Sequence, residues 1–341
     1  MLDNPSTTTP KAVHIPEQLK TPLKATADGK LFFFGKPIPA ILFQNGQRQF
    51  LAFLSFFHEK ITNNHTQQAY AHAIIQFLQW STDQGYLLHT LDPNAIQKYT
   101  QTKRYSNATL KQHLAAIRRF FDWLITKQIL EENPALPVKG PSPNLRRGKT
   151  PPLTAEEART LLGSIHTENV VGARDHALVS IMLYGFAKVS TAISMQVKDF
   201  TERQGQYWLC VPGKDNTFHK VPAHSAIVIS LQHYLKLAGI ADDSQSPLFR
   251  SVRGRMKAVT ERGMHRSDVL RMIKRRALDA GLKRPICCHS FRATGISRYL
   301  EQGGNLEQAQ SLAAHESPRT TRQYHPRPNT VSRTELERIQ F

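Results

Sequence analysis

The sequence predicts a mainly α-helical fold with a small β-hairpin, organised as an N-terminal helical domain followed by a mixed α/β domain. Three observations carry this prediction. Apolar residues recur at helical spacing within residues 47–133, a proline-rich basic stretch spans 134–152, and one strand-like pair of segments lies within the largely helical residues 153–329. Two domains also suit a chain of 341 residues.

The N-terminal part divides into an arm and a helical domain. Residues 1–46 begin rich in proline and threonine and then carry an apolar patch, LFFFGKPIPAILF, so we expect an arm with one ordered piece. Asn64–Trp80 and Asn107–Leu124 each place apolar residues along one helix face, and Ser106 or Asn107 can cap the second helix.

Basic residues are strongly in excess. The formal net charge of +19 implies attraction to a polyanion, with nucleic acid the leading candidate and an acidic membrane surface the weaker one. A charged helix face is usually just solvated, but the net charge of the whole chain makes a phosphate-contacting face roughly as likely here, so both interpretations stay open. The candidate nucleic-acid contacts, on the helices and in the basic linker 134–152, are Lys103, Arg104, Lys111, Arg118, Arg119, Arg146, Arg147 and Lys149.

The second domain shows clear local signals. Thr154 with Glu157 three residues later forms a capping box that starts a helix. The stretch ARDHALVSIMLYGFA is apolar enough for a buried helix, and GQYWLCVPGKDNTFHKVPAH reads as two strands joined by a glycine-containing turn. Helical patterns recur in Ser225–Ala238, Arg266–Ala280, Ser290–Gln302 and Leu306–Ala314.

The cellular compartment is indicated by what the chain lacks. Its three cysteines are odd in number and have no C-x-x-C spacing, which argues against a disulfide framework or a zinc site and favours a reducing compartment. It has no run of 18 apolar residues and no apolar core of a signal peptide near its start. We therefore expect a cytoplasmic protein without a membrane span.

Two segments of the second domain combine chemically versatile residues. HSFRATGISRYL places His289 and Arg292 three residues apart, on one face of a helix turn. LAAHESPRTTRQY places Tyr324 nine residues after His315. Either pair alone is more often structural than functional.

Together, the two segments resemble the C-terminal signature of the tyrosine recombinase, or phage integrase, family. That signature is H-x-x-R followed by a segment like L-G-H-S-x-x-x-T-T-x-x-Y. Ala314 stands in place of the glycine and Glu316 in place of the serine, while the Thr320–Thr321 pair and its spacing to Tyr324 match. The resemblance covers residues 47–330 and implies a helical core-binding domain, a basic linker and a mixed α/β catalytic domain.

The resemblance implies a site-specific DNA recombinase that cleaves and rejoins DNA through a 3′-phosphotyrosyl intermediate. Tyr324 is the expected nucleophile, and Arg292 and His315 are expected to bind nonbridging phosphate oxygens. His289 would be a general base or a support for the phosphate. Cationic side chains would stabilise the charge, so no metal, cofactor or small-molecule substrate is expected.

Two lysines complete the implied site. Lys214 follows a glycine in the hairpin, as the family's general acid does, and Lys220 on the same hairpin is its rival. The family's first catalytic arginine stands in a context like G-L-R-V-S-E-L, whereas this chain reads YGFAKVSTAISM and aligns Lys188 there. Arg174 lies a whole helix earlier and is no substitute.

Lys188 keeps an alternative open. A lysine offers one compact charge, whereas an arginine can bind two phosphate oxygens at once. The substitution fits natural divergence, a decayed enzyme or a deliberate change, so a DNA-binding protein with impaired cleavage is the first alternative. A type IB topoisomerase, which uses similar tyrosine chemistry, is the second.

The resemblance also implies partners. We expect double-stranded DNA and a tetramer assembled on two DNA sites. Thr330–Phe341 can form a short amphipathic helix, and this tail, residues 330–341, is expected to pack on a neighbouring subunit. The sequence leaves open the DNA target and the choice among integration, excision, resolution and transposition.

Overall fold

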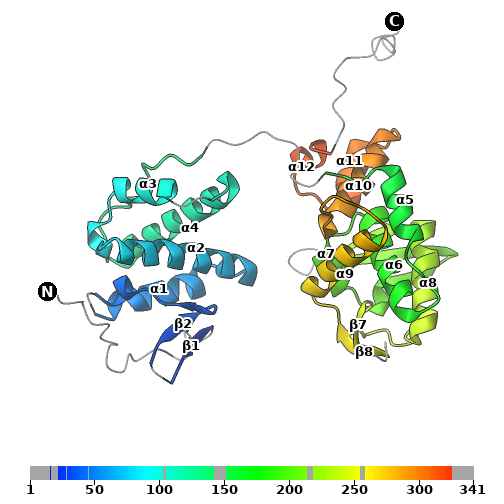
Figure 1. Ribbon diagram of the computed structural model, residues 1–341, viewed down its shortest axis with the longest axis horizontal. Coiled ribbons are helices and arrows are strands. Elements are labelled where there is room, and N and C mark those ends of the chain that lie inside the picture. The colour runs from blue at the N-terminus through cyan, green and yellow to red at the C-terminus, as the bar shows by residue number, and fades with distance from the viewer. Residues whose placement is uncertain are drawn as a thin grey trace, which may run out of the picture. The chain divides into compact units, whose positions relative to one another are not determined.

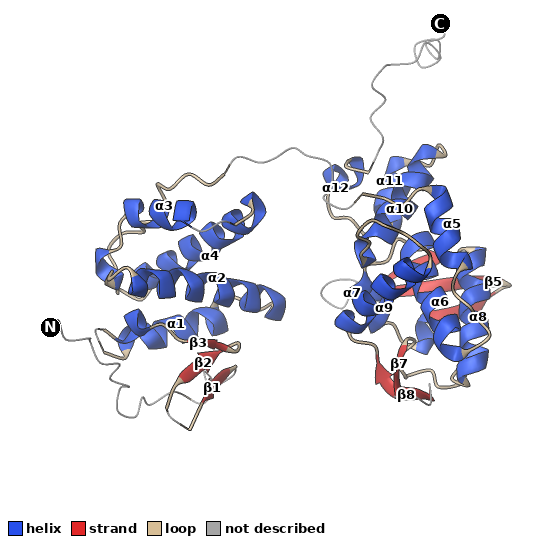
Figure 2. Cartoon of the chain, in the orientation of Figure 1, coloured by secondary structure: helices blue, strands red, loops and turns tan. Residues whose placement is uncertain are grey.

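The computed structural model describes residues 16, 22–27, 29–44, 46–102, 105–141, 151–212, 218–253 and 258–324. The chain divides into two compact units, Met1–Leu145 and Arg146–Phe341. Helices dominate each unit (Figure 1), and the strands form only small antiparallel sheets (Figure 2), which confirms the predicted fold class. In the described ranges, no helix is both long and apolar enough to span a membrane.

The first unit is a helical bundle with an aromatic core. Asn63 caps its second helix by accepting hydrogen bonds from the backbone N–H groups of His65 and Thr66, and Ser106 caps its fourth by accepting from Thr109. Ser106 is thus the cap, of the two candidates. The helices are α1 (Arg48–Glu59), α2 (Asn64–Asp83), α3 (Pro93–Thr102) and α4 (Asn107–Thr126), and a short 3₁₀ turn, η3 (Leu88–Thr90), precedes α3.

The ordered piece of the predicted N-terminal arm belongs to the core of the first unit. Its side chains Phe33, Ile41 and Leu42 are at most 1% exposed and join the same hydrophobic cluster as the helices. Burial of such side chains contributes about 1.5–3 kcal/mol each, which explains why this stretch packs. Its elements are the antiparallel strands β1 (Leu23–Ala25), β2 (Leu31–Phe33) and β3 (Lys36–Pro37) and the 3₁₀ helix η2 (Ala40–Phe43).

The second unit is built around one buried helix. Helix α6 (Val170–Tyr184) is apolar on nearly every side, as its sequence predicts, and packs against α8 (Ser225–Ala238) and α10 (Cys288–Glu301). The capping box of Thr154 and Glu157 is present at the start of α5. The remaining helices of the described part are α5 (Ala155–Gly163), α7 (Val189–Ser194), α9 (Arg266–Asp279), α11 (Leu306–Leu312) and α12 (Pro318–Arg322).

Two small sheets lie in the described part of the second unit. The predicted hairpin is present as β5 (Gln206–Pro212) and β6 (Phe218–Pro222), with β4 (Phe200–Arg203) after the turn η4 (Val197–Asp199) as a third antiparallel strand. A second antiparallel pair, β7 (Arg250–Arg253) and β8 (Ala258–Gly263), is not predicted by the sequence patterns.

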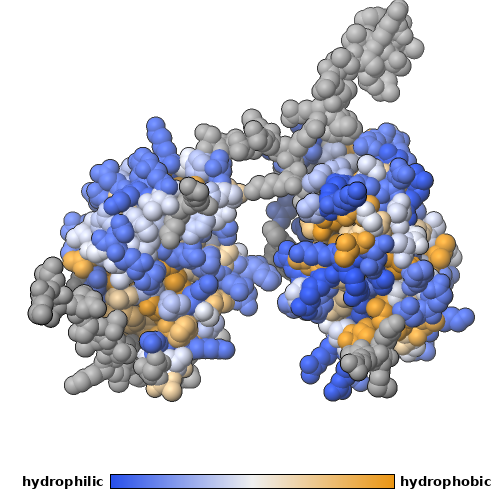
Figure 3. All heavy atoms as spheres, viewed as in Figure 1, coloured by the Kyte–Doolittle hydropathy of each residue, from blue (hydrophilic) through white to orange (hydrophobic). Residues whose placement is uncertain are grey.

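A buried ion pair ties three elements of this unit together. Asp175 on α6 is fully buried and accepts hydrogen bonds from the guanidinium groups of Arg174 and Arg276 at 2.7–3.1 Å. Arg174 also donates to the carbonyl of Arg250 on β7 at 3.0 Å. Arg174 is therefore a structural residue, consistent with its exclusion from the catalytic set. On the face drawn in Figure 3, hydrophilic residues cover much of each unit, and smaller hydrophobic patches lie among them on the same surface.

Candidate active site

Helix α10 carries the H-x-x-R motif into the second unit. The hydroxyl of Ser290 accepts from the backbone N–H of Cys287 at 3.2 Å and so helps to start the helix. Thr294 holds the segment that leads into α5, because its hydroxyl oxygen accepts a hydrogen bond from the backbone N–H of Leu153 at 2.7 Å. Gly295 lets α10 approach α6 closely, since a Cβ there would lie 1.9 Å from the carbonyl oxygen of Leu183. These contacts fix the helix on which His289 and Arg292 lie.

Arg292 is held in the interior of the unit. It is 3% exposed, and its two Nη atoms donate to the carbonyl oxygens of Phe186 and Ala313, the latter at 2.6 Å. Its buried Nε has no hydrogen-bond partner in the described part of the chain. Burial lowers the pKa of the guanidinium, and Tyr324 partly opposes this shift. A guanidinium has five N–H donors, so this fixed cation keeps donors for an anion.

His315 follows the end of α11 on a strained backbone. Ala314 lies in the left-handed region, with φ 46°, where the family signature has a glycine. Gln310 brackets the main chain of His315: its carbonyl oxygen accepts from the His315 N–H, and its amide donates to the His315 carbonyl, both at 3.0 Å. The ring Nδ1 of His315 lies 2.9 Å from the hydroxyl oxygen of Thr321.

Tyr324 meets both histidines. Its hydroxyl oxygen lies 2.9 Å from Nε2 of His289, and its ring lies parallel to that of His315, with centroids 6.0 Å apart. The backbone carbonyl of Tyr324 accepts from the hydroxyl of Ser297 on α10 at 3.3 Å. The structure thus brings His289, Arg292, His315 and Tyr324 into one cluster.

The electrostatics of the cluster follow from burial and positive charge. Burial, and then the charge of Arg292, lower the pKa of His315 to about 4, with Lys188 adding to the effect. The pKa of His289 is lowered for the same reasons. Burial raises the pKa of Tyr324, while Arg292 opposes the rise. At neutral pH both imidazoles are therefore neutral and the phenol is protonated.

The two lysine candidates differ in what is known of their positions. Lys188 is the exposed N-cap residue of α7, and it is near enough for its charge to lower the pKa of both histidines. Lys214 lies outside the described residues. The rival Lys220 is exposed on β6, with its Nζ 5.0 Å from the ring centre of Trp208.

Chemically, the cluster combines a nucleophile, a base and an anion-binding group. A neutral imidazole at hydrogen-bond distance from a phenol can take its proton. A guanidinium fixed beside it can stabilise negative charge that develops on a phosphate. The sequence motifs predicted His289, Arg292, His315 and Tyr324. They did not predict Ser297, which donates to the backbone of Tyr324, or Gln310, which holds the backbone of His315.

The candidate nucleic-acid contacts have varied positions. Arg119 is exposed on α4 and Lys111 is half-buried there. Arg118 donates to the carbonyl oxygens of Ala135, at 3.0 Å, and Val138, so its guanidinium holds the segment after α4. The others lie outside the described residues: Lys103, Arg104, Arg146, Arg147 and Lys149.

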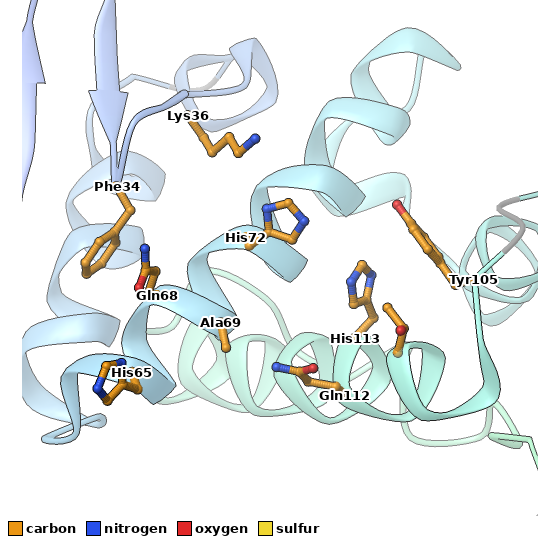
Figure 4. Close-up of a pocket in the computed structure, with 10 residues that line it drawn as sticks. Phe34, Lys36, His65, Gln68, Ala69, His72, Tyr105, Gln112 and His113 are labelled. Atoms are coloured by element: carbon orange, nitrogen blue, oxygen red, sulfur yellow. The ribbon is translucent and has the colours of Figure 1, made fainter. Parts of the chain in front are cut away.

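A hollow of about 400 Å³ lies in the first unit, between α2, α4 and the turn before β3 (Figure 4). Lys36, His65 and His72 contribute nitrogen groups to its wall. Beneath them His113 is 3% exposed, and its Nδ1 lies 2.9 Å from the Tyr99 hydroxyl. Burial, with the charge of His72, lowers the pKa of His113 to about 4. No sequence pattern predicts this hollow.

Comparison with known proteins matches both units to one family. Residues 151–329 match the model of the phage integrase family, and residues 48–128 match the phage integrase N-terminal SAM-like domain. Among curated relatives, tyrosine recombinase XerC of Salmonella typhi is 27% identical over 225 residues, covering 66% of this chain and 71% of the relative. XerC of Vibrio vulnificus strain YJ016 is 29% identical over 222 residues, covering 64% of this chain and 65% of the relative.

Solved structures share the fold. XerH site-specific recombinase bound to a palindromic difH substrate aligns with a TM-score of 0.64 and 19% identity, over 82% of this chain and 80% of that one. A lambda integrase dimer bound to a COC′ core site aligns with a TM-score of 0.62 and 15% identity, over 82% and 77% of the two chains.

Proposed function

Because the chain belongs to the phage integrase family of tyrosine recombinases, we propose that it is a site-specific recombinase that cleaves and rejoins DNA through Tyr324. The observation that carries this assignment of the nucleophile is the 2.9 Å separation of the Tyr324 hydroxyl from Nε2 of His289, beside Arg292 and His315.

Proton transfer makes the phenol reactive. Because burial raises the pKa of Tyr324, the free phenolate is scarce at neutral pH, and the proton must leave as the phenol attacks. His289 is the acceptor: its lowered pKa keeps the ring neutral, and in the tautomer protonated at Nδ1 its Nε2, 2.9 Å from the phenol oxygen, takes the proton. As the bond from the tyrosine oxygen to phosphorus forms, the bond to the 5′ oxygen breaks.

Charge on the phosphate is balanced by the surrounding donors. Arg292 and His315 donate to the nonbridging oxygens, and Lys188 adds a positive charge in the place of the family's first arginine. Lys214 is proposed, from the resemblance, to protonate the leaving 5′ oxygen. The product is a 3′-phosphotyrosyl bond, which the 5′-hydroxyl of a second strand then attacks. One phosphoester replaces another, so no external energy source is needed.

The partners follow from the same proposal. The solved relatives named above are bound to DNA, and this chain's excess of positive charge supports DNA as its partner too. We propose DNA contacts of the first unit at Arg118, Arg119 and Lys111 and around the hollow lined by Lys36, His65 and His72. We further propose a tetramer on two sites, held by residues 330–341. Deleting 330–341 is expected to abolish assembly on DNA while sparing binding to a single site, and normal assembly of the truncated chain contradicts the tail's role.

The alternatives receive less support. The relatives and solved structures named above are recombinases and an integrase, so a type IB topoisomerase is not favoured. The alternative of a DNA-binding protein with impaired cleavage is supported only by Lys188, which would slow the reaction without changing its chemistry. The three cysteines are free, which supports the expected cytoplasmic location.

A trapping experiment tests the function. Duplexes bound by the full chain are first selected from a pool of random sequence and then nicked, so that a cleaved strand loses a short fragment and cannot be rejoined. We expect a covalent protein–DNA adduct on a denaturing gel for the natural chain and none for Tyr324→Phe, which keeps its DNA affinity. Specific binding without an adduct contradicts cleavage, and an undiminished adduct with Tyr324→Phe contradicts the assigned nucleophile.

A further inference from the structure

The hydroxyl of Thr321 has a single hydrogen-bond partner among the residues that the structure describes. Thr321 lies on α12, three residues before Tyr324, and is 0% exposed. Its Oγ1 lies 2.9 Å from Nδ1 of His315. Because the side chain is fully buried, this contact must satisfy the hydroxyl.

The direction of this hydrogen bond follows from counting protons. A hydroxyl carries one proton, and burying it without an acceptor costs free energy. If Nδ1 of His315 carried a proton and donated it, the Thr321 proton would have no acceptor. Thr321 therefore donates, and Nδ1 accepts with its lone pair.

An accepting Nδ1 fixes the rest of the ring. Burial and the charges of Arg292, Lys188 and His289 hold the pKa of His315 at about 4, so the ring is neutral at pH 7. A neutral imidazole carries one proton, which must then be on Nε2. Gln310 bonds both the N–H and the carbonyl of His315, so the backbone that carries the imidazole ring is held in place.

We propose that Thr321 is a positioning residue that holds His315 as the Nε2–H tautomer. His315 then presents a neutral N–H donor at the site, while Thr321 itself never touches the DNA. The tautomer exists without DNA, whereas its use as a donor to a phosphate oxygen rests on the proposed function. The second threonine of the matched Thr320–Thr321 pair thereby gains a physical role.

Nitrogen-15 NMR of the histidine rings tests the tautomer in the full chain without DNA. At pH 7 we expect the His315 ring, identified by its loss in His315→Asn, to show an unprotonated, hydrogen-bonded Nδ1 and a protonated Nε2. Thr321→Ser keeps the hydroxyl and should keep this pattern, whereas Thr321→Val should lose it. Thr320→Val removes the neighbouring hydroxyl, which has no hydrogen bond to His315, and serves as the matched control.

The trapping experiment then measures the consequence for cleavage. Losing one oriented donor is expected to slow adduct formation about tenfold in Thr321→Val, with Thr321→Ser within about twofold of the natural chain and DNA affinity unchanged. A protonated Nδ1 in the natural chain, or in Thr321→Ser, overturns the inference even if Thr321→Val does not fold. So does an unchanged His315 spectrum in a folded Thr321→Val. The predicted tautomer in a chain that binds DNA but forms no adduct supports the inference and contradicts the proposed function instead.

Discussion

Replacing Gly295 with alanine tests how the packing of α10 supports the site. A Cβ at this position would lie 1.9 Å from the carbonyl oxygen of Leu183 and 2.9 Å from two ring carbons of Phe186. Distances under 3.0 Å are essentially never seen for a real Cβ, so α10 must move away from the end of α6. Arg292 lies one turn earlier on α10 and donates to the carbonyl of Phe186, so this movement reaches the site.

The magnitude follows from two opposing effects. Overpacking a close contact typically costs about 1–3 kcal/mol, and here a backbone oxygen and an aromatic ring both resist, which favours the upper end. The higher helix propensity of alanine over glycine stabilises the folded chain by about 1 kcal/mol. The net expectation is a loss of about 2 kcal/mol in the free energy of unfolding, together with slower adduct formation.

Urea unfolding of the full chain, followed by circular dichroism, measures this loss. Gly163→Ala is the matched control, because Gly163 is the last residue of α5 and a Cβ there meets nothing within 4 Å. We expect the control to be at least as stable as the natural chain. If Gly295→Ala unfolds at the same urea concentration as the control, the close approach of α10 to α6 is wrong.

Three further predictions concern the site and its surroundings. Lys188→Arg is expected to speed adduct formation about tenfold, since a two-pronged charged donor is worth about 1.5 kcal/mol more than a single one, and an unchanged rate counts against Lys188 as the limiting group. Ala314→Gly should raise the free energy of unfolding by up to about 1 kcal/mol. The left-handed conformation costs alanine about 1–2 kcal/mol, and the larger conformational entropy of glycine in the unfolded chain offsets only part of the gain. A lower urea midpoint for Ala314→Gly contradicts this. The pKa of His315, about 4 in the folded chain against an ordinary 6.5, means that the unfolded chain takes up the proton first. The contribution of His315 to stability is therefore complete above pH 6.5 and is lost as the pH falls toward 4, so the melting temperature should fall over this range. His315→Asn should make this fall less steep, and an equally steep fall in the variant argues against the lowered pKa.

Much of the fold follows from local sequence signals. The bounds of α8 are those predicted from apolar spacing, and the Thr154 capping box starts α5 as expected. Strand β7 escaped prediction because Arg250–Arg253, RSVR, is short and charged, and forms by pairing with β8. The apolar patch before residue 46 joins the first unit's core because it finds tertiary partners, which local patterns do not reveal.

The site shows the same division between local and distant information. The motifs identify His289, Arg292, His315 and Tyr324 because their spacing is characteristic. The carbonyl of Phe186 lies 106 residues from Arg292 in sequence, so no motif predicts that contact. Arg118 is a further case, since the sequence predicts it as a phosphate contact and does not reveal that its guanidinium also donates to the carbonyl oxygens of Ala135 and Val138.

Identifying the residue that carries the DNA tests whether Tyr324 is the nucleophile. The trapped adduct is digested with trypsin and nuclease, and the nucleotide-bearing peptide is sequenced by mass spectrometry. We expect a nucleotide joined through its 3′ phosphate to Tyr324, with a free 5′-hydroxyl on the released fragment. A nucleotide on any other residue, or a link through the 5′ phosphate, contradicts it.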